Sequence, residues 1–154
     1  MEVIVETHQV FNQVPKLTRP NAYLDDPLLQ QLLKKIPSFD HKPLSDYGAQ
    51  YERLEKLGFE ANHYLPECKT HDRYGVRQDF LEYHEAYHQL MRLAKQGGIH
   101  AYPWTQKPHG HLTRMGLFYL HAQAEAGTAC PLSMTYAGIP LLHQNPSLKK
   151  TWLP

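Results

Sequence analysis

An all-helical fold is predicted by three features of the sequence. Apolar residues recur at helical spacing in several segments, no convincing run alternates between apolar and polar residues, and prolines or glycines flank the periodic stretches. The 154 residues are enough for one domain with an apolar core. We therefore expect a single helical domain over residues 1–154 with about five to six helices. An extended arm at residues 1–24 and one short turn or hairpin complete the prediction.

The first helix is predicted at residues 25–37 (DDPLLQQLLKKIP). Asp25 or Asp26 can cap its first turn, and Pro27 suits the first helical position. Pro37 ends the segment, because proline cannot continue the backbone hydrogen bonds of a helix. The leucines between these ends share one face, which is typical of a helix that packs on a core.

A second helix is predicted at residues 45–58 (SDYGAQYERLEKLG), with Ser45 as its N-cap and Gly58 at its C-terminal end. Residues 59–79 lack helical periodicity and contain a sequence typical of a turn. A short extended piece is expected at residues 80–83 (FLEY).

The second half of the chain predicts four further segments. A third helix is expected at residues 84–96, where two glycines end it, and a fourth at residues 111–126. A fifth begins near Pro131, and a last helical turn has Asn145 as its cap. Pro140 lies within the fifth segment and is expected to bend it.

Composition excludes several classes of function. The formal net charge is only +1, so no strong overall field would attract the chain to nucleic acid or to a membrane surface. Two cysteines, Cys68 and Cys130, make no disulfide framework, which favours a reducing, cytoplasmic setting. No apolar run approaches the ~18 residues that a membrane span needs, and the first residues do not resemble a secretory signal.

A zinc-protease signature, H-E-x-x-H, is present at His84, Glu85 and His88. In such enzymes the two histidines share one helix face and bind Zn²⁺, while the glutamate polarises the metal-bound water. Here the four residues before His84 favour an extended chain. His84 is therefore expected to cap the helix, and His88 to pack beside Tyr87 and Met91. Glu125 is the only candidate third ligand from the chain's next helix, and its surroundings match no ligand motif. We therefore predict no metal site.

Other catalytic patterns are absent from the sequence. There is no G-x-S-x-G motif, no evident Cys–His pair and no glycine-rich loop that precedes a helix. Basic residues do not cluster with aromatic residues as a nucleic-acid surface would require. The residues alone therefore predict a helical domain that contains no complete active site, and we assign no catalytic residue.

The order of several motifs resembles one known family. The chain contains THQVFNQVPKL and NAYLDDPLL, followed by ANHYLPE and DRYGVRQDFLEYHEAYHQLM. LHAQAEAGTACPLSMTYAGIPLL and WLP complete the series. Together they resemble the N-terminal region of the AidB-like branch of the acyl-CoA dehydrogenase family. In that family a proline usually stands where Glu85 is found here, which places His84 at the start of a helix.

The resemblance implies a flavoprotein built from three parts: a helical N-terminal domain, a β-rich middle domain and a helical C-terminal bundle. In the family, FAD binds mainly between the second and third parts, and the catalytic carboxylate lies in the third. This implies that the flavin site and the catalytic base are absent from this chain. No bound cofactor and no turnover are then expected of it alone. The parent reaction would be α,β-dehydrogenation of an acyl thioester with hydride transfer to flavin, or a degenerate form of it.

Some functional residues of the family would still map to this chain. By position, Thr128, Pro131, Met134 and Thr135 are implied to line part of the acyl pocket. The alternative is that Met134 and its neighbours are ordinary core residues. The resemblance also implies a homo-oligomer, a tetramer in the family, and contacts with the missing middle and C-terminal domains. It associates the branch with the alkylation response, and any DNA binding with the absent C-terminal part.

Two other functions remain open. The chain could be a stand-alone helical interaction module, because its proline-rich connectors and many tyrosines suit contact with a partner. It could also be a small zinc hydrolase that uses His84, Glu85 and His88.

Overall fold

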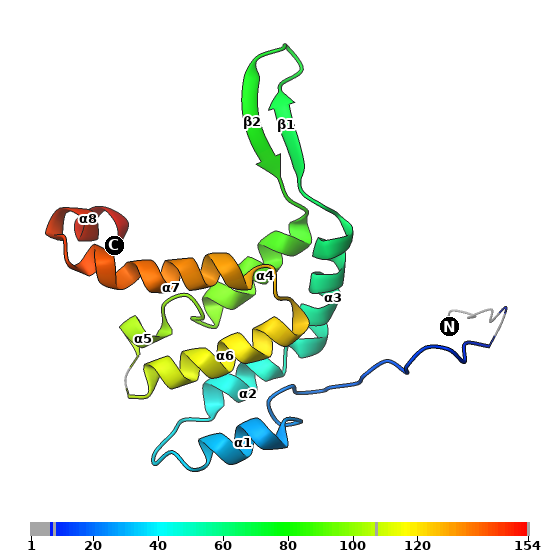
Figure 1. Ribbon diagram of the computed structural model, residues 1–154, viewed down its shortest axis with the longest axis vertical. Coiled ribbons are helices and arrows are strands. Elements are labelled where there is room, and N and C mark those ends of the chain that lie inside the picture. The colour runs from blue at the N-terminus through cyan, green and yellow to red at the C-terminus, as the bar shows by residue number, and fades with distance from the viewer. Residues whose placement is uncertain (1–6, 8, 107, 154) are drawn as a thin grey trace.

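The computed structural model describes residues 7, 9–106 and 108–153. These residues form eight helices and one two-stranded sheet (Figure 1). In chain order the elements are α1 Pro27–Leu33, α2 Lys42–Gly48, α3 Tyr51–His63, β1 Glu67–His71, β2 Arg77–Glu82, α4 Glu85–Gln96, α5 Tyr102–Thr105, α6 Gly110–Ala124, α7 Ala129–His143 and α8 Pro146–Trp152. The predicted all-α class, with one hairpin, is confirmed.

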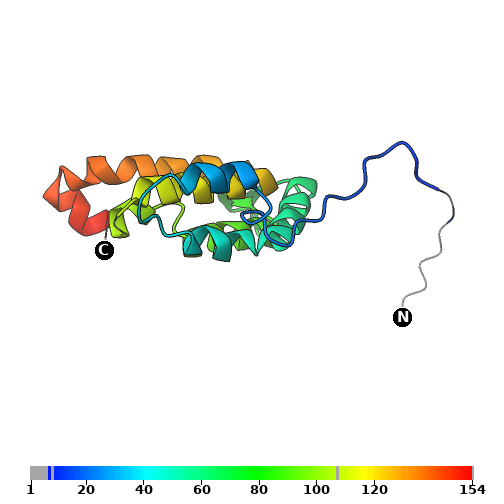
Figure 2. The same cartoon turned by 90° about the horizontal axis from the view of Figure 1, so that it is seen from below.

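The helices lie in two layers, which Figure 2 shows edge-on. Helices α1, α6 and α7 form one layer, and α2, α3 and α4 form the other. Helix α6 is central, because it contacts α2, α3, α5 and α7. Its Leu117 and Leu120 are buried against Leu44 of α2, Leu54 of α3 and Leu90 of α4 in one apolar core.

Close approach of α2 to α6 depends on Gly116. A Cβ atom at this position would lie 2.6 Å from Cδ2 of Leu44, so only glycine leaves room for that side chain. Leu44 itself is completely buried. The absence of a side chain on α6 therefore allows the two layers to meet closely at this crossing.

The turn before α1 belongs to the core rather than to an arm. Ala22 and Tyr23 are buried, and the backbone N–H of Ala22 donates to the carbonyl of Gly48 at the end of α2 (3.0 Å). The predicted extended arm at residues 1–24 is therefore wrong for its last residues. Residues 9–19 have no regular secondary structure, and residues 1–6 and 8 lie outside the described residues.

Helix α1 follows the sequence prediction closely. Asp26 is the N-cap, and its Oδ1 accepts a hydrogen bond from the backbone N–H of Leu29 (2.8 Å). Pro27 occupies the first position. The helix ends at Leu33, four residues before Pro37, because Lys34 to Ile36 form a turn.

The predicted second helix is in fact two helices. Ser45 lies inside α2 rather than at an N-cap, and Ala49 and Gln50 separate α2 from α3. Gly58 does not end a helix either, because α3 continues to His63. Its role is packing: a Cβ atom there would lie 2.8 Å from the carbonyl oxygen of Ala124. The expectation that residues 59–79 contain no helix is therefore wrong at its start.

The hairpin of β1 and β2 projects from the helical body (Figure 1). The strands are antiparallel, and a bulge interrupts their register between Lys69 and His71. Asp72 turns the chain between them, since its Oδ1 accepts from the backbone N–H groups of Tyr74 and Val76. Gly75 supplies the left-handed backbone of this turn.

The second half of the fold agrees with the predicted elements. Helix α4 begins after His84 and ends at Gln96, just before the two glycines. The proline-rich connector contains the short helix α5, which the sequence did not predict. Helix α7 passes through Pro140 without ending, and Asn145 caps α8 by accepting from the backbone N–H groups of Ser147 and Leu148.

Among the described residues, none of the helices combines the length and the apolar character that would be needed to cross a bilayer.

Two glycines offer a matched test of this packing. We expect Gly48→Ala to lower the free energy of unfolding by about 1–3 kcal/mol, because its Cβ would lie 2.7 Å from the backbone nitrogen of Tyr23. Gly138→Ala should instead be neutral or stabilise by up to about 1 kcal/mol, since nothing lies within 4 Å of its Cβ and alanine is the better helix former. Urea unfolding of both variants measures the difference. Equal effects at the two positions would contradict the close contact at Gly48.

Candidate functional site

A cavity of about 200 Å³ lies at the base of the hairpin. Four elements meet there: the end of α3, the connections on both sides of the hairpin, the start of α4 and the turn between α6 and α7. Tyr64, Tyr83, His84 and Tyr87 supply aromatic walls, and Glu125 and Thr128 supply polar groups. The lining is mostly apolar with a few polar groups, which is the usual composition of a small-molecule site.

The aromatic residues of the cavity are paired. Tyr64 stacks on His84 with ring centroids 4.6 Å apart, and Tyr83 stacks on Tyr87 at 4.3 Å. Offset ring pairs of this kind add about 0.5–1.5 kcal/mol beyond their buried area. The two pairs connect the hairpin base to α4, so they help to fix the shape of the cavity wall.

Behind the cavity, a chain of buried hydrogen bonds crosses the molecule. Nδ1 of His121 lies 2.8 Å from the hydroxyl oxygen of Tyr47, and its Nε2 lies 2.7 Å from Oγ1 of Thr128. Oγ1 of Thr128 in turn donates to Oε2 of Glu125 (2.6 Å). The chain thereby links α2, α6 and the start of α7.

The direction of these hydrogen bonds follows from the single proton on each hydroxyl group. Thr128 uses its proton on Glu125, so Nε2 of His121 must donate to Thr128. Nδ1 of His121 then accepts the proton of the Tyr47 hydroxyl group. His121 is therefore neutral and protonated on Nε2. Every polar side-chain atom in this series of hydrogen bonds has a partner.

Glu125 is held as a carboxylate by its hydrogen bonds. Burial alone would raise its pKa, but hydrogen bonds from the Thr128 side chain and backbone, the Gly127 backbone and the Asn62 side chain outweigh burial and lower the pKa. The backbone donors lie 2.6 Å (Gly127) and 2.7 Å (Thr128) from its oxygens. Glu125 therefore fixes the turn between α6 and α7.

His121 and Tyr47 are the other two ionisable groups of this hydrogen-bond chain. Burial shifts their pKa values in the direction that favours the neutral forms. It lowers the pKa of His121, although the nearby charge of Glu125 opposes this shift. It also raises the pKa of Tyr47. Neither group carries charge at neutral pH, which is consistent with a buried position that contains only one anion.

The histidines of the H-E-x-x-H motif do not meet at a metal site. His84 precedes α4, and its Nδ1 accepts from the backbone N–H of Ala86 (3.3 Å), which confirms the predicted N-cap. His88 is exposed and contacts Tyr83 and Tyr87 through ring edges. Within residues 7, 9–106 and 108–153, no group of three or more His, Cys, Asp or Glu residues could hold a metal ion.

The four residues implied to line an acyl pocket are not brought together on one surface. Thr128 is buried and lines the cavity, whereas Pro131 is half-buried one turn into α7. Met134 is 70% exposed, so it is not an ordinary core residue. Thr135 is also exposed, and its hydroxyl group donates to the carbonyl of Pro131.

The outward face of α7 is apolar and exposed. Cys130, Met134, Ala137 and Leu141 follow one another at helical spacing on this face, which we call the α7 stripe. Leu141 is 67% exposed. A helix that is apolar on all sides is normally buried, so the α7 stripe is a surface that another segment can cover.

Arg114 is a buried residue with several polar and ring contacts, and the sequence prediction missed it. It is only 5% exposed, and its guanidinium lies 4.5 Å and 4.3 Å from the ring centres of Phe118 and Tyr136. Its Nε donates to the carbonyl of Ile99, and its Nη2 donates to Oγ of Ser133. These contacts tie α6 to α7, and no signal in the sequence marked Arg114 as buried.

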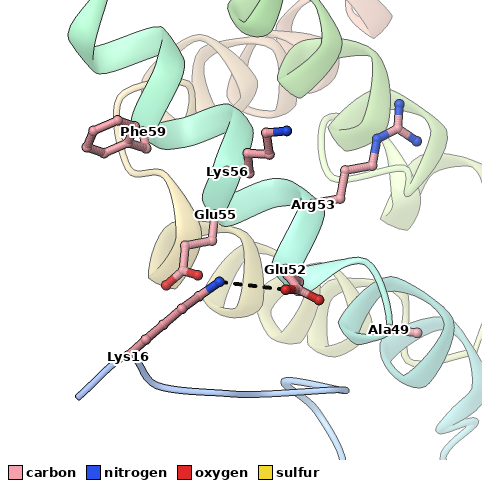
Figure 3. A pocket seen from close by; sticks show the side chains of 7 residues that line it. All are labelled: Lys16, Ala49, Glu52, Arg53, Glu55, Lys56 and Phe59. Atoms are coloured by element: carbon pink, nitrogen blue, oxygen red, sulfur yellow. Dashed lines mark ion pairs between the residues drawn. The ribbon is translucent and has the colours of Figure 1, made fainter. Parts of the chain in front are cut away.

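A larger hollow on α3 is less suited to a ligand. Figure 3 shows its lining residues, among them Lys16 from the N-terminal segment and Glu52 and Phe59 from α3. Lys16 and Glu52 form an ion pair at 3.7 Å, but both side chains are exposed. Exposed pairs contribute little energy, so this hollow is an open surface and offers no buried polar group to bind a ligand.

The hydroxyl group of Thr128 can be removed without a change of shape. We expect Thr128→Val to lower the free energy of unfolding by about 1–3 kcal/mol, because Nε2 of His121 then loses its acceptor and Glu125 a donor. Thr128→Ser keeps the hydroxyl group and should retain most of the stability. Thr135→Val is the control, since its exposed hydroxyl should contribute no more than about 0.5 kcal/mol. Equal free energies of unfolding for Thr128→Val and Thr128→Ser would contradict the hydrogen-bond chain.

The lowered pKa values predict a loss of stability in acid. The unfolded chain protonates His121 as pH falls through its ordinary value of 6.5, whereas the folded chain does so only at lower pH. The unfolded state therefore binds more protons, and the free energy of unfolding falls with pH in this range. Glu125 adds to the loss as pH falls below its ordinary value of 4.5.

His121→Gln should reduce the difference in unfolding free energy between pH 7.5 and pH 5. Urea unfolding at both pH values measures it, with His143→Gln on the exposed end of α7 as the control. Burial also lowers the pKa of His100, so part of the difference should remain. A His121 variant with an unchanged difference would refute the neutral buried state of this residue.

Comparison with known proteins identifies the family. The family model for the adaptive response protein AidB N-terminal domain matches residues 12–154 of this chain. The chain is 36% identical over 144 residues to AidB of Escherichia coli (strain K12), an alignment that covers 90% of this chain.

Two solved structures are similar to the whole domain. Bd2924 in its apo form has a TM-score of 0.85 and 25% identity over 95% of this chain. Caenorhabditis elegans ACDH-11, solved in complex with C11-CoA, has a TM-score of 0.76 and 21% identity over 91% of this chain, which shows a common fold. The chain spans 27% of the length of E. coli AidB, 31% of Bd2924 and 25% of ACDH-11. This chain belongs to the AidB N-terminal domain family, and its fold is that of the N-terminal helical region of acyl-CoA dehydrogenase-type proteins.

Proposed function

We propose that residues 1–154 act as the N-terminal helical domain of an FAD-dependent acyl-CoA dehydrogenase-like protein of the AidB branch. In this role the domain supplies one wall of an acyl-thioester pocket. The flavin site and the catalytic base belong to polypeptide outside this chain. The family match over residues 12–154 is the observation that supports this proposal most directly.

The exposed α7 stripe supports a role as one wall of a larger site. Met134 and Leu141 present apolar surface that no described residue covers. Apolar side chains on a rigid helix suit contact with an acyl chain or with a second domain that encloses it. Thr128, Pro131, Met134 and Thr135 lie at the end of this helix nearest the aromatic cavity, and we propose them as acyl-contacting residues.

FAD does not fit the aromatic cavity. The aromatic cavity measures about 200 Å³, whereas cavities for drug-sized ligands usually measure about 300–1,000 Å³. Its polar groups also already bind one another, since the oxygens of Glu125 accept from Gly127 and Thr128. We therefore propose that other domains of the complete protein hold the flavin.

Further properties of the complete protein are proposed on the same basis. The middle and C-terminal domains are its expected partners, and a homo-oligomer, such as a tetramer, is its expected assembly. Cys68 and Cys130 are both exposed and unpaired, which suits a reducing, cytoplasmic setting. A part in the alkylation response, with any DNA contact made by the C-terminal region, completes the proposal.

A chimera tests the proposal. Residues 12–154 would replace the matching region of E. coli AidB, and acyl-CoA binding would be followed by the change in flavin absorbance. We expect the chimera to retain flavin. This chain alone should bind less than one flavin per protein molecule. Met134→Lys should weaken acyl-CoA binding by about tenfold or more, because a charge would enter an apolar wall. Met115→Lys, an exposed methionine on α6, is the matched control.

Two outcomes would contradict different parts of this proposal. A folded chimera without flavin would argue against the flavoprotein role. A flavin-bound chimera in which Met134→Lys and Met115→Lys bind acyl-CoA equally well would remove α7 from the pocket wall.

A further inference from the structure

The segment at residues 9–19, which we call the arm, exposes four large apolar side chains. Phe11 and Val14 are each 89% exposed, and Val10 and Leu17 are also largely exposed. Figures 1 and 2 both show the arm leading away from the helical body. Single exposed apolar residues are common on proteins, but four within eight residues of one segment make a local concentration of exposed apolar surface.

The root of the arm is fixed to the body. Nη1 of Arg19 donates to Oε1 of Gln123 on α6 (2.6 Å), and the guanidinium of Arg19 lies 5.9 Å from the centre of the Tyr51 ring. Pro20 and Pro15 stiffen the chain on both sides of this anchor. The arm therefore leaves the body in a defined direction, and Val10, Phe11 and Val14 lie beyond the residues that contact the body.

An apolar groove lies elsewhere on the same chain, between α1 and α6. It measures about 300 Å³, and its walls are formed by Leu28 and Leu32 of α1 and by Leu112, Met115 and Tyr119 of α6. Leu28, Leu32 and Met115 are each more than half exposed. We call this surface the α1–α6 groove, and it is separate from the α7 stripe.

The arm and the groove match in charge and in chemical character. Residues 9–14 contain no charged side chain, and neither do the residues that line the groove. A charged peptide would bury a charge in such a groove, whereas residues 9–14 carry only uncharged groups, and their three amide side chains can stay in water while Val10, Phe11 and Val14 enter it. An extended peptide of about nine residues reaches about 30 Å, which is enough to cross from one body to the next.

We propose that the arm of one copy binds the α1–α6 groove of a second copy. When two chains each give an arm to the other, the exchange forms a closed, symmetric pair. A second copy is favoured over the chain's own groove because the arm runs away from its own body in both views. This surface differs from the proposed acyl wall, so the two proposals can fail separately.

Light scattering after size exclusion, across a wide range of concentration, tests the pairing. The unmodified chain forms dimers, and Phe11→Ser on the arm raises the dissociation constant by about tenfold or more. Leu28→Glu on the groove does the same, and its acidic group suits the first turn of α1, so the helix is kept. Leu141→Ser on the α7 stripe is the matched control and leaves the dissociation constant unchanged.

Chemical cross-linking tests which arm enters which groove. Cys68 and Cys130 are first replaced by serine. Asn12→Cys is then placed in one tagged pool, and Gln31→Cys, an exposed residue on α1, in a second pool. A short bis-maleimide joins the two tags when the pools are mixed, and Phe11→Ser in the first pool abolishes this product.

Several results would overturn the arm exchange. A monomer at all concentrations without a mixed product would do so. A chain that carries both Asn12→Cys and Gln31→Cys and is cross-linked only within itself would also do so, because the arm would then occupy its own groove. A dimer that resists Phe11→Ser and Leu28→Glu but dissociates with Leu141→Ser would show association through the α7 stripe instead.

Discussion

The carboxylate of Glu125 is the interaction on which the arrangement of the helices depends. It stands after the last residue of α6, and its oxygens accept from the backbone N–H groups of Gly127 and Thr128. A carboxylate that caps exposed N–H groups at the start of a helix also suits the positive end of the helix dipole. The side chain of Glu125 thus fixes the four-residue turn, 125–128, that sets the direction of α7 relative to α6.

The same carboxylate extends its effect to the second layer of helices. Through Thr128 and His121 it is connected to Tyr47 of α2, and α3 comes close to it at Gly58. The turn between α6 and α7, which borders the aromatic cavity, therefore shares one buried network with α2. A change at any member would move the cavity wall as well as the core, because partly satisfied buried polar groups are costly.

Local rules predicted the parts of the fold whose causes are local. Asp26, His84 and Asn145 were recognised as caps because a capping side chain binds a backbone group two or three residues away. The break between α2 and α3 was missed, since the tyrosine and leucine stripe of residues 47–57 continues across Ala49 and Gln50. A turn or hairpin and an extended piece at residues 80–83 were expected, but the bounds of the two strands were not. Both faces of the strands are exposed, so burial imposes no alternation on their sequence.

The candidate site was only partly predictable for the same reason. Thr128 and the end of α7 were found through resemblance to a family. The hydrogen-bond chain that contains Thr128 was not predictable, because it continues through His121 to Tyr47, which lies 74 positions from His121 in the sequence. Arg114 was missed because an arginine on a helix ordinarily faces water. Phe118 lies one turn away on the same helix, but only the fold brings Tyr136 of α7 to the guanidinium.

The two uncovered apolar surfaces lie on different elements and suit different occupants. The α7 stripe is a smooth helical face, whereas the α1–α6 groove is a hollow between two helices. A groove accepts an extended peptide, and a smooth helix face accepts another folded element. This difference supports the assignment of the α7 stripe to the rest of the parent polypeptide and of the groove to an arm.

The hairpin has a practical consequence. Its turn at residues 72–76 is closed by hydrogen bonds from its own backbone to Asp72, and the space around Gly75 is empty. An epitope or a fluorescent label inserted there would disturb neither helical layer. The tip of the hairpin is thus a natural attachment point for imaging this domain inside a larger assembly.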